Sequence, residues 1–329
     1  MSKLYKNLII FTALFLALNA SALILTSPND LVLSVSPASP RAGQVVTVTA
    51  KSFAFDAPRT NFRWTLNGKE IASGVGLVEQ TFTAGALGSV MNITVRAVSA
   101  DGLPYEAGVS VSIADIDFVV HSATYVPQFY RGAALPTPGS VVEVIAVPHL
   151  FRGGSRISQQ NLIYEWSLDG KPVLSQSGGG RNKLALKLAD VGGSSYLVTL
   201  KINTLDGVVF TQKSARIKTY EPEILFYETN ALTGLKPQAI LSFFGLAGSS
   251  FSILAEPFFF DLNSLKRSEV RWSANGEKIA LTAEPKNPRL LELTAPSGAE
   301  SQTNFSLKIE DKEHIFQSAE AGLMVKASQ

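Results

Sequence analysis

The sequence predicts an all-β chain of three tandem antiparallel β-sandwich domains that follow an N-terminal signal segment. Three observations predict it: a six-residue phrase that occurs three times, side-chain alternation with a period of two, and no amphipathic stretch of helix length. About seven short strands, separated by turn residues at regular spacing, fit into each repeat. This pattern is typical of two packed antiparallel sheets.

The repeated phrase begins at each of the three tryptophans in the chain. It reads Trp-Thr-Leu-Asn-Gly-Lys from Trp64, Trp-Ser-Leu-Asp-Gly-Lys from Trp166 and Trp-Ser-Ala-Asn-Gly-Glu from Trp272. The copies lie 102 and 106 residues apart, which is the length of one small domain. Asn-Gly or Asp-Gly between apolar residues predicts a type I′ turn, because both turn positions need a positive φ. Each copy is therefore expected to be a strand, a two-residue turn and a returning strand.

Residues around each tryptophan alternate between apolar and polar. Phe62, Trp64 and Leu66 share one face of the first predicted strand, whereas Arg63 and Thr65 share the other. The other two copies alternate in the same way. Such a strand has one buried and one solvated face. The three tryptophans are therefore predicted to be core residues that fill the space between two sheets, not stacking platforms for sugar rings.

A second block supports the repeat independently of the tryptophans. Residues 43–55 align without gaps to residues 139–151 and to residues 248–260, and the Gly-to-Ala spacing is seven in all three. The predicted domains occupy residues 27–115, 116–220 and 221–329. The joints between them are short and lack the Gly/Ser-rich composition of flexible linkers, which favours a semi-rigid rod.

Residues 1–22 are typical of a targeting signal. Lys3 and Lys6 supply positive charge, residues 8–18 form an apolar core, and small residues end the segment at Ala22. We expect cleavage after Ala22. An uncleaved anchor is the alternative, because residues 8–25 approach the length of a membrane-spanning helix. In both cases the chain is expected to be exported, to the periplasm, the cell surface or the extracellular space, with membrane contact only through an uncleaved segment.

Charge and cysteine content exclude several classes of protein. Apart from Lys3 and Lys6, the chain has 27 basic and 27 acidic residues, so nothing in its charge indicates binding to nucleic acid or to anionic lipid. The chain contains no cysteine, which excludes disulfides, thiolate metal sites and cysteine nucleophiles. The cores must then be stabilised by hydrophobic burial.

The phrase Trp-x-x-Asn/Asp-Gly-Lys after a strand of period two resembles the third-strand region of immunoglobulin-like (Ig-like) domains. It is also similar to the Trp-centred segment of PKD-type repeats in bacterial surface proteins. Two departures are visible: the paired cysteines of antibody-type domains are absent, and the PKD phrase Trp-x-Phe-Gly-Asp-Gly is reduced to Trp-x-Leu-Asn/Asp-Gly. The resemblance implies a structural or adhesive protein of the cell envelope or surface with protein partners, for example in the assembly of a surface appendage.

A carbohydrate-binding extracellular module is the alternative function. It requires outward-facing aromatic side chains on one concave face, and Tyr125, Tyr130 and Tyr196 are the residues whose positions test it.

We predict no enzymatic activity, no catalytic residue and no bound organic cofactor. The three histidines lie at non-equivalent places in different repeats, and the sequence has neither a Gly-x-Ser-x-Gly elbow nor a His-Glu-x-x-His helix. The glycine run at residues 178–180 lacks the Lys-Ser/Thr ending of a phosphate-binding loop. Hydrolysis by two carboxylates is left open, since 27 acidic residues permit many pairs.

Acidic residues at the two joints suggest a calcium site. Asp115 and Asp117 at the first joint correspond to Glu221 and Glu223 at the second. Carboxylates two residues apart on an extended chain are suitable oxygen ligands for Ca²⁺, which takes six to eight. The alternative is a solvated linker with two acids on one face.

Aromatic residues at the entries to the second and third domains are the candidates for partner binding. These are Tyr125, Phe129, Tyr130, Phe243 and Phe244, which lie in stretches rich in Pro and Gly without clean alternation. Exposed aromatic residues in such loops often mark partner surfaces. The alternative is an edge strand that folds back over the sandwich and buries its own rings.

Overall fold

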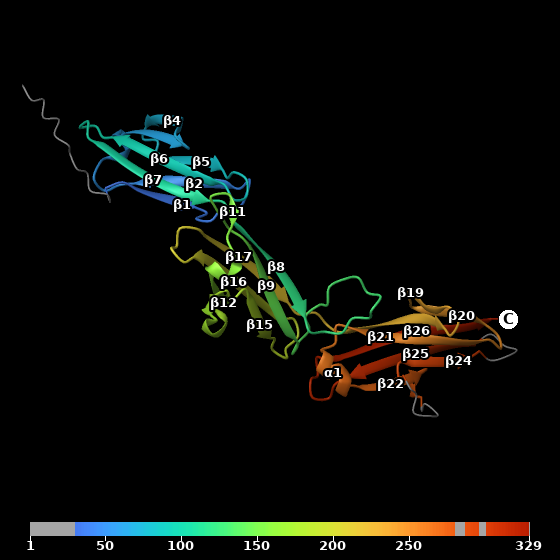
Figure 1. Cartoon of the computed structure of the whole chain (residues 1–329). Coiled ribbons are helices and arrows are strands. Elements are labelled where there is room, and N and C mark those ends of the chain that lie inside the picture. The colour runs from blue at the N-terminus through green and yellow to red at the C-terminus, as the bar shows by residue number, and fades with distance from the viewer. Residues whose placement is uncertain (1–29, 280–286, 296–300, 329) are drawn as a thin grey trace, which may run out of the picture. The chain divides into compact units, whose positions relative to one another are not determined.

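The computed structural model describes residues 30–279, 287–295 and 301–328, and over these residues the chain is all-β (Figure 1). The predicted fold class is thus confirmed. The described residues contain one short α-helix, α1 (Leu262–Arg267), which is too short for a helical period to be visible in the sequence. None of the described helices is both long and apolar enough to cross a membrane. The predicted signal segment, residues 1–22, lies outside the described residues.

The chain divides into two compact units. Among the described residues, the first unit consists of residues 30–35, 47–80 and 92–109, and the second of residues 36–46, 81–91 and 110–328. The division into three domains is not tested by these units and stays a prediction. The sheets themselves group along the sequence as strands β1–β7, β8–β17 and β18–β26.

Strands β1–β7 form two sheets. One has the order β1-β2-β5 and the other the order β4-β3-β6-β7. Their bounds are β1 (Val32–Ser36), β2 (Val45–Lys51), β3 (Asn61–Leu66), β4 (Lys69–Val75), β5 (Glu79–Thr83), β6 (Val90–Val98) and β7 (Pro104–Ser112), with a 3-10 turn at Ala57–Arg59. Within the first unit, Trp64 of β3 lies opposite Val95 of β6, and both side chains are fully buried.

Strands β8–β17 form what we call the central sheets. The main orders are β15-β9-β8 and β13-β12-β16-β17, with β14 also paired to β12 and a separate β10-β11 hairpin. Their bounds are β8 (Asp115–Ser122), β9 (Val141–His149), β10 (Phe151–Arg152), β11 (Ser155–Arg156), β12 (Leu162–Leu168), β13 (Lys171–Pro172), β14 (Gly178–Gly179), β15 (Lys183–Lys187), β16 (Ser195–Thr204) and β17 (Phe210–Lys218). Two 3-10 turns lie at Gln159–Asn161 and Leu174–Gln176. Trp166 packs in their core with Tyr164 and Leu200.

Strands β18–β26 form what we call the C-terminal sheets. Their orders are β19-β18-β21-β24 and β20-β26-β25-β22-β23. Their bounds are β18 (Glu223–Asn230), β19 (Gly234–Ile240), β20 (Ser242–Leu246), β21 (Ser250–Phe258), β22 (Glu269–Ala274), β23 (Glu277–Lys278), β24 (Leu290–Thr294), β25 (Ser301–Glu310) and β26 (Ser318–Ser328). Trp272 packs between the two sheets with Phe226 and Leu307.

The turn after each tryptophan has the predicted geometry. Asn67, Asp169 and Asn275 have φ values of 51°, 49° and 49°, and the glycines that follow them have φ values of 80°, 79° and 88°. Two consecutive positive φ values are the requirement of a type I′ turn. The Asn/Asp-Gly pair therefore sets each hairpin, since other residues adopt this conformation only with strain.

Each tryptophan is buried and its indole N–H is hydrogen-bonded to the main chain. The indole of Trp64 donates to the carbonyl of Leu77 at 2.8 Å, that of Trp166 to Arg181 at 2.9 Å, and that of Trp272 to Pro288 at 2.9 Å. A buried indole needs such a partner, because an unpaired polar group in the core is costly. The same indole-to-carbonyl hydrogen bond in all three repeats shows that each tryptophan is held in its core in the same way.

Candidate functional site

The segment between β8 and β9, residues 123–140, packs on the C-terminal sheets, and we call it the covering segment. Its main chain pairs with the end of β21: the N–H of Tyr125 donates to the carbonyl of Phe260, and the N–H of Phe259 donates to the carbonyl of Tyr125, both at 2.7 Å. Thr124 also forms an isolated antiparallel bridge with Asp261. The covering segment thus behaves as a short extra strand laid on the C-terminal sheets.

The aromatic side chains of the covering segment lie against apolar residues on the outer face of β18 and β21. The Phe129 ring lies 5.0 Å from that of Tyr227, and the Tyr130 ring lies 5.4 Å from that of Phe258, both edge to face. Tyr227 and Phe258 are buried there. Edge-to-face pairs of this kind stabilise packing beyond the area they bury.

Three of the aromatic residues predicted for partner binding thus have contacts within the chain. Tyr125, Phe129 and Tyr130 are half-buried; Phe129 and Tyr130 pack on the C-terminal sheets, and Tyr125 contacts Glu256. These contacts are those of the alternative in which the segment buries its own rings, but they do not test partner binding, which stays a prediction for these residues. The run Phe258–Phe260 is buried: Phe258 and Phe259 contact the Tyr130 ring, whereas Phe260 belongs to the core around Trp272.

Buried hydrogen bonds join the covering segment to the C-terminal sheets. The Thr137 hydroxyl donates to the carbonyl of Phe259 at 2.9 Å. The Gln317 side-chain amide donates to the Thr137 hydroxyl at 3.0 Å and to the carbonyl of Pro138 at 2.6 Å. Its oxygen accepts from the main-chain N–H of Asp261 at 2.7 Å. Since Thr137 and Gln317 are buried, breaking these bonds leaves polar groups away from water.

A buried carboxylate lies beside Tyr125. Glu256 of β21 accepts from the Tyr125 hydroxyl at 3.1 Å and from the Arg289 guanidinium at 2.8 Å. Burial raises the pKa of Tyr125 above its ordinary value. The guanidinium also lies over the Tyr125 ring, 5.8 Å from its centroid. Glu256 is thus a paired structural charge, as buried carboxylates generally are.

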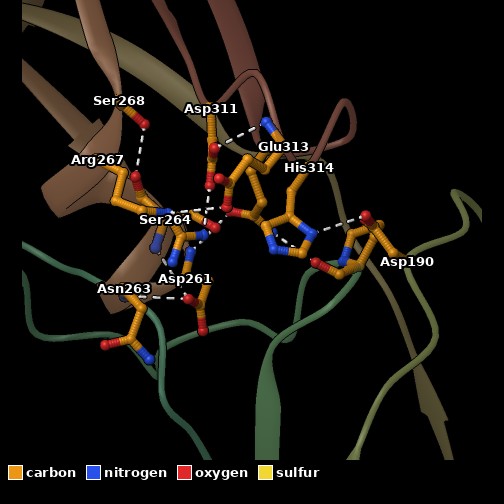
Figure 2. A network of polar contacts seen from close by, with 11 residues as sticks. Asp190, Asp261, Asn263, Ser264, Arg267, Ser268, Asp311, Glu313 and His314 are labelled. Atoms are coloured by element: carbon orange, nitrogen blue, oxygen red, sulfur yellow. Dashed lines mark hydrogen bonds and ion pairs between the residues drawn. The ribbon is translucent and has the colours of Figure 1, made fainter.

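A polar network around α1 connects the C-terminal sheets to Asp190 of the central sheets (Figure 2). Asp261 caps α1 by accepting from the N–H groups of Asn263 and Ser264. Arg267 donates to the buried Asp311 at 2.8 Å. Burial raises the pKa of Asp311, but hydrogen bonds, chiefly from Arg267, outweigh burial and hold it below its ordinary value.

The same network reaches the central sheets through one contact. His314 Nδ1 lies 2.9 Å from Asp190 Oδ2. This contact joins the C-terminal sheets to the segment after β15, whereas the Asp261 cap and the Arg267–Asp311 ion pair lie within the C-terminal part of the chain.

An open cleft of about 760 Å³ lies at the other end of β21, on the C-terminal sheets. It is formed where β18 ends, β21 begins and β24 ends, with β20 along one side; its lining comprises residues 228–232, 243–246, 249–252 and 292–294. The cleft contains the two remaining aromatic candidates, Phe243 and Phe244. It is therefore the candidate functional site.

The two phenylalanines have different environments in this cleft. Phe243 is half-buried and stacks on Phe251 with ring centroids 4.4 Å apart. Phe244 is 69% exposed, and the Lys326 ammonium lies over its ring, 5.9 Å from the centroid. Of the five predicted aromatic residues, Phe244 is thus the one that presents its ring to solvent.

Three exposed leucines near the cleft were missed by the sequence analysis. Leu232, Leu241 and Leu246 are 95%, 82% and 68% exposed. Leu232 and Leu246 line the cleft, and Leu241 directly precedes β20. Phe244 and Leu246 share a face of β20 because they are two residues apart, but the sequence does not show that β20 presents this face to water.

The acidic residues of the calcium hypothesis lie apart from the cleft and have cationic neighbours. Asp115 lies 3.3 Å from Arg41 and 3.7 Å from Lys213, and Asp117 lies 3.7 Å from Lys213 and 2.9 Å from His149. The hydrogen bond with His149 lowers the pKa of Asp117.

Glu221 and Glu223 at the second joint are both exposed. Within the described ranges, no group of three or more acidic or histidine side chains is placed to hold a metal ion. The geometry therefore supplies no support for the calcium site, which stays a prediction.

The fold defines a class of protein: an all-β chain whose strands pair mainly as antiparallel sheets. No protein-family model and no curated protein matches the sequence. Solved structures do resemble it, at low identity.

The fibronectin(III)-like modules of Clostridium thermocellum CbhA share 17% identity, with 57% of this chain and 94% of that chain covered and a TM-score of 0.27. The central fibronectin-III array of RIM-binding protein shares 10%, with 91% and 96% covered and a TM-score of 0.31. Bacteroides ovatus SGBP-B, solved with a mixed-linkage heptasaccharide, shares 13%, with 90% and 70% covered and a TM-score of 0.23. At these scores neither a function nor a partner transfers to this chain.

Proposed function

We propose that the chain is an exported, non-enzymatic structural or adhesive protein that binds protein partners at the cleft of the C-terminal sheets. The observation that carries the proposal is the exposure of Phe244 and Leu246 beside that cleft. Large apolar side chains grouped around a concave surface are typical of binding sites, whereas a single exposed one is ordinary.

The chemistry of the cleft supports binding in preference to catalysis. Its described lining contains no histidine, and three of its hydroxyls are already hydrogen-bonded: Ser249 donates to the carbonyl of Leu246 at 2.6 Å, and Ser250 lies 3.0 Å from the Thr294 hydroxyl. A serine nucleophile needs an adjacent base. Of the two carboxylates in the lining, Glu228 is paired with Lys236 at 2.6 Å.

The proposal is tested by removing the exposed apolar side chains. The double variant Phe244→Ser, Leu246→Ser is expected to retain at least tenfold less envelope protein on an immobilised chain than the natural sequence does, because central apolar contacts dominate protein interfaces. Phe53→Ser, which removes a fully exposed ring from the first unit, is the matched control. Equal retention by all three proteins would refute the proposal.

Binding of a glycan is the second candidate function, and one observation favours it. The cleft combines aromatic rings with several hydroxyl and carboxylate side chains, as sites for polar ligands do. The residues named for this function from the sequence do not support it: Tyr130 packs on Phe258, and the Tyr196 hydroxyl accepts from the N–H of Ala189 on the central sheets. A glycan array probed with the natural chain and with Phe244→Ser decides between the candidates, since only cleft-bound glycans are lost in the variant.

A further inference from the structure

Strand β20 is the edge of its sheet. It pairs in parallel with β26, from Ser242 opposite Met324 to Leu246 opposite Ser328, and among the described residues no strand pairs with its other side. Edge strands present unpaired main-chain groups that can accept another strand. In this chain the edge runs along the cleft that contains Phe243 and Phe244.

The main-chain groups that point away from the sheet can be assigned. The N–H of Met324 donates to the carbonyl of Leu241 at 3.2 Å, so that carbonyl faces β26. Main-chain groups alternate in direction along a strand. Those of Phe243 and Gly245 therefore face β26 as well, and those of Ser242, Phe244 and Leu246 face the open side.

The open side thus offers three donors and two acceptors in a row. The donors are the N–H groups of Ser242, Phe244 and Leu246, and the acceptors are the carbonyls of Ser242 and Phe244. The carbonyl of Leu246 is already used, because it accepts from the N–H and the hydroxyl of Ser249. This is the pattern that an added strand of about five residues satisfies.

Apolar side chains accompany the open edge. Phe244 and Leu246 share the exposed face of β20, since they are two residues apart. An added strand places alternate side chains on that same face, where they contact the Phe244 ring and the Leu246 methyl groups. An exposed edge strand that carries apolar side chains is a site for pairing.

Charge around the cleft favours one kind of added strand. Glu228 and Glu292 line the cleft; Glu228 is paired with Lys236, but Glu292 has no cationic partner within the described part of the chain. A basic side chain on the incoming segment supplies that partner. Complementary charge chiefly sets specificity and the rate of association.

We infer that the partner binds by strand addition: an extended segment with apolar residues at alternate positions and a basic residue near Glu292 pairs with the open side of β20. Strand addition to an exposed sheet edge is a general mode of peptide recognition, in which main-chain hydrogen bonds give affinity and side-chain pockets give selectivity. The inference rests on the proposed function, because it assigns a recognition mode to the same cleft.

Proline at position 242 tests the open edge without removing the apolar residues. Ser242→Pro deletes one outward N–H and leaves the pairing with β26, since the N–H of residue 242 faces the open side. Ser242→Ala is the matched control. Preserved tryptophan fluorescence and an unchanged unfolding midpoint show that the variant is folded.

The probe is a library of random dodecapeptides displayed on phage and selected on the immobilised chain. Strand addition predicts enriched peptides with alternating apolar residues and at least one Lys or Arg. Their binding is at least tenfold weaker to Ser242→Pro than to Ser242→Ala, and several-fold weaker to Glu292→Gln than to the natural chain. In the complex, the amides of Ser242, Phe244 and Leu246 exchange their hydrogens more slowly.

Failure of this inference is distinguishable from failure of the proposed function. Peptides that lose binding with Phe244→Ser but bind Ser242→Pro as well as Ser242→Ala refute strand addition and leave the cleft as a protein-binding site. A selection that enriches no peptide, or only peptides whose binding is unchanged by every one of these variants, also refutes strand addition.

Discussion

Asn67 and Asn92 exchange two hydrogen bonds. The main-chain N–H of Asn67 donates to the carbonyl of Asn92 at 2.8 Å, and the N–H of Asn92 donates to the side-chain oxygen of Asn67 at 2.9 Å. Asp169 with Leu197, and Asn275 with Asn304, repeat the exchange. The Asn or Asp before each turn glycine therefore has two structural roles. It adopts a positive φ, and its side-chain oxygen accepts a hydrogen bond from a residue near the start of a strand distant in sequence.

Replacing the turn residue by alanine is expected to destabilise the fold. Asp169→Ala loses an oxygen that accepts from Leu197 at 2.8 Å and forces alanine into a positive φ. The two effects together cost about 2 kcal/mol of unfolding free energy. Asp169→Asn, which keeps the oxygen and tolerates this conformation, is expected within about 0.5 kcal/mol of the natural chain. Urea unfolding measures both, and equal stability of the two variants would contradict this account of the turn.

Gln317 is expected to be among the most sensitive polar residues of the chain. Gln317→Ala removes three hydrogen bonds and leaves the N–H of Asp261 and the carbonyl of Pro138 without these partners in a buried region. The expected cost is about 2–4 kcal/mol, the penalty of unsatisfied buried groups. It is measured by urea unfolding of the whole chain.

The control for this substitution is Gln302→Ala on β25, where the side chain is exposed. We expect it to change the unfolding free energy by less than about 0.5 kcal/mol. If Gln317→Ala lowers the unfolding free energy no more than Gln302→Ala does, the covering segment is not held by the hydrogen bonds described above.

Alkaline pH is expected to destabilise the central sheets through Tyr164. Burial raises the pKa of Tyr164 to about 12 from an ordinary value of 10.0. The folded state therefore holds this proton more tightly than the unfolded state does. Its contribution to stability is complete below pH 10 and is lost as the pH rises from about 10 to about 12.

Tyr164→Phe removes this titration. Burial also raises the pKa of Tyr125 and Tyr227, but these residues titrate in both proteins, so the difference between the two pH profiles isolates Tyr164. Unfolding free energy measured from pH 9 to pH 12 should fall less steeply in Tyr164→Phe. Parallel profiles would show that Tyr164 ionises normally.

Export is tested at the N-terminus. Mass spectrometry of the protein isolated from its own cells is expected to find a chain that begins at Leu23, because cleavage is predicted after Ala22. Ala22→Arg is expected to block cleavage and leave the whole segment attached. An intact Met1 end on the natural protein in the membrane fraction would support the anchor alternative instead.

Sequence reasoning succeeded where the interactions are local. The period of two around Trp64 and the Asn-Gly turn depend on neighbouring residues, so the strand and its hairpin were predictable.

The candidate site was harder to predict, because it depends on contacts between distant segments. Tyr130 and Phe244 look alike in sequence, since both aromatic residues lie in Pro/Gly-bounded stretches. One packs on Phe258, more than a hundred residues away, and the other is exposed. No local pattern distinguishes them, because covering an apolar sheet face is a long-range event.

The central claim is that a protein partner binds at Phe244, and site-specific photo-cross-linking tests it most directly. A photoreactive phenylalanine analogue is placed at position 244 or, as the control, at the fully exposed position 53, in the protein produced by its own cells. We predict discrete cross-linked protein adducts from position 244 that are absent from position 53. No adduct at position 244, or the same adducts from both positions, would contradict the claim.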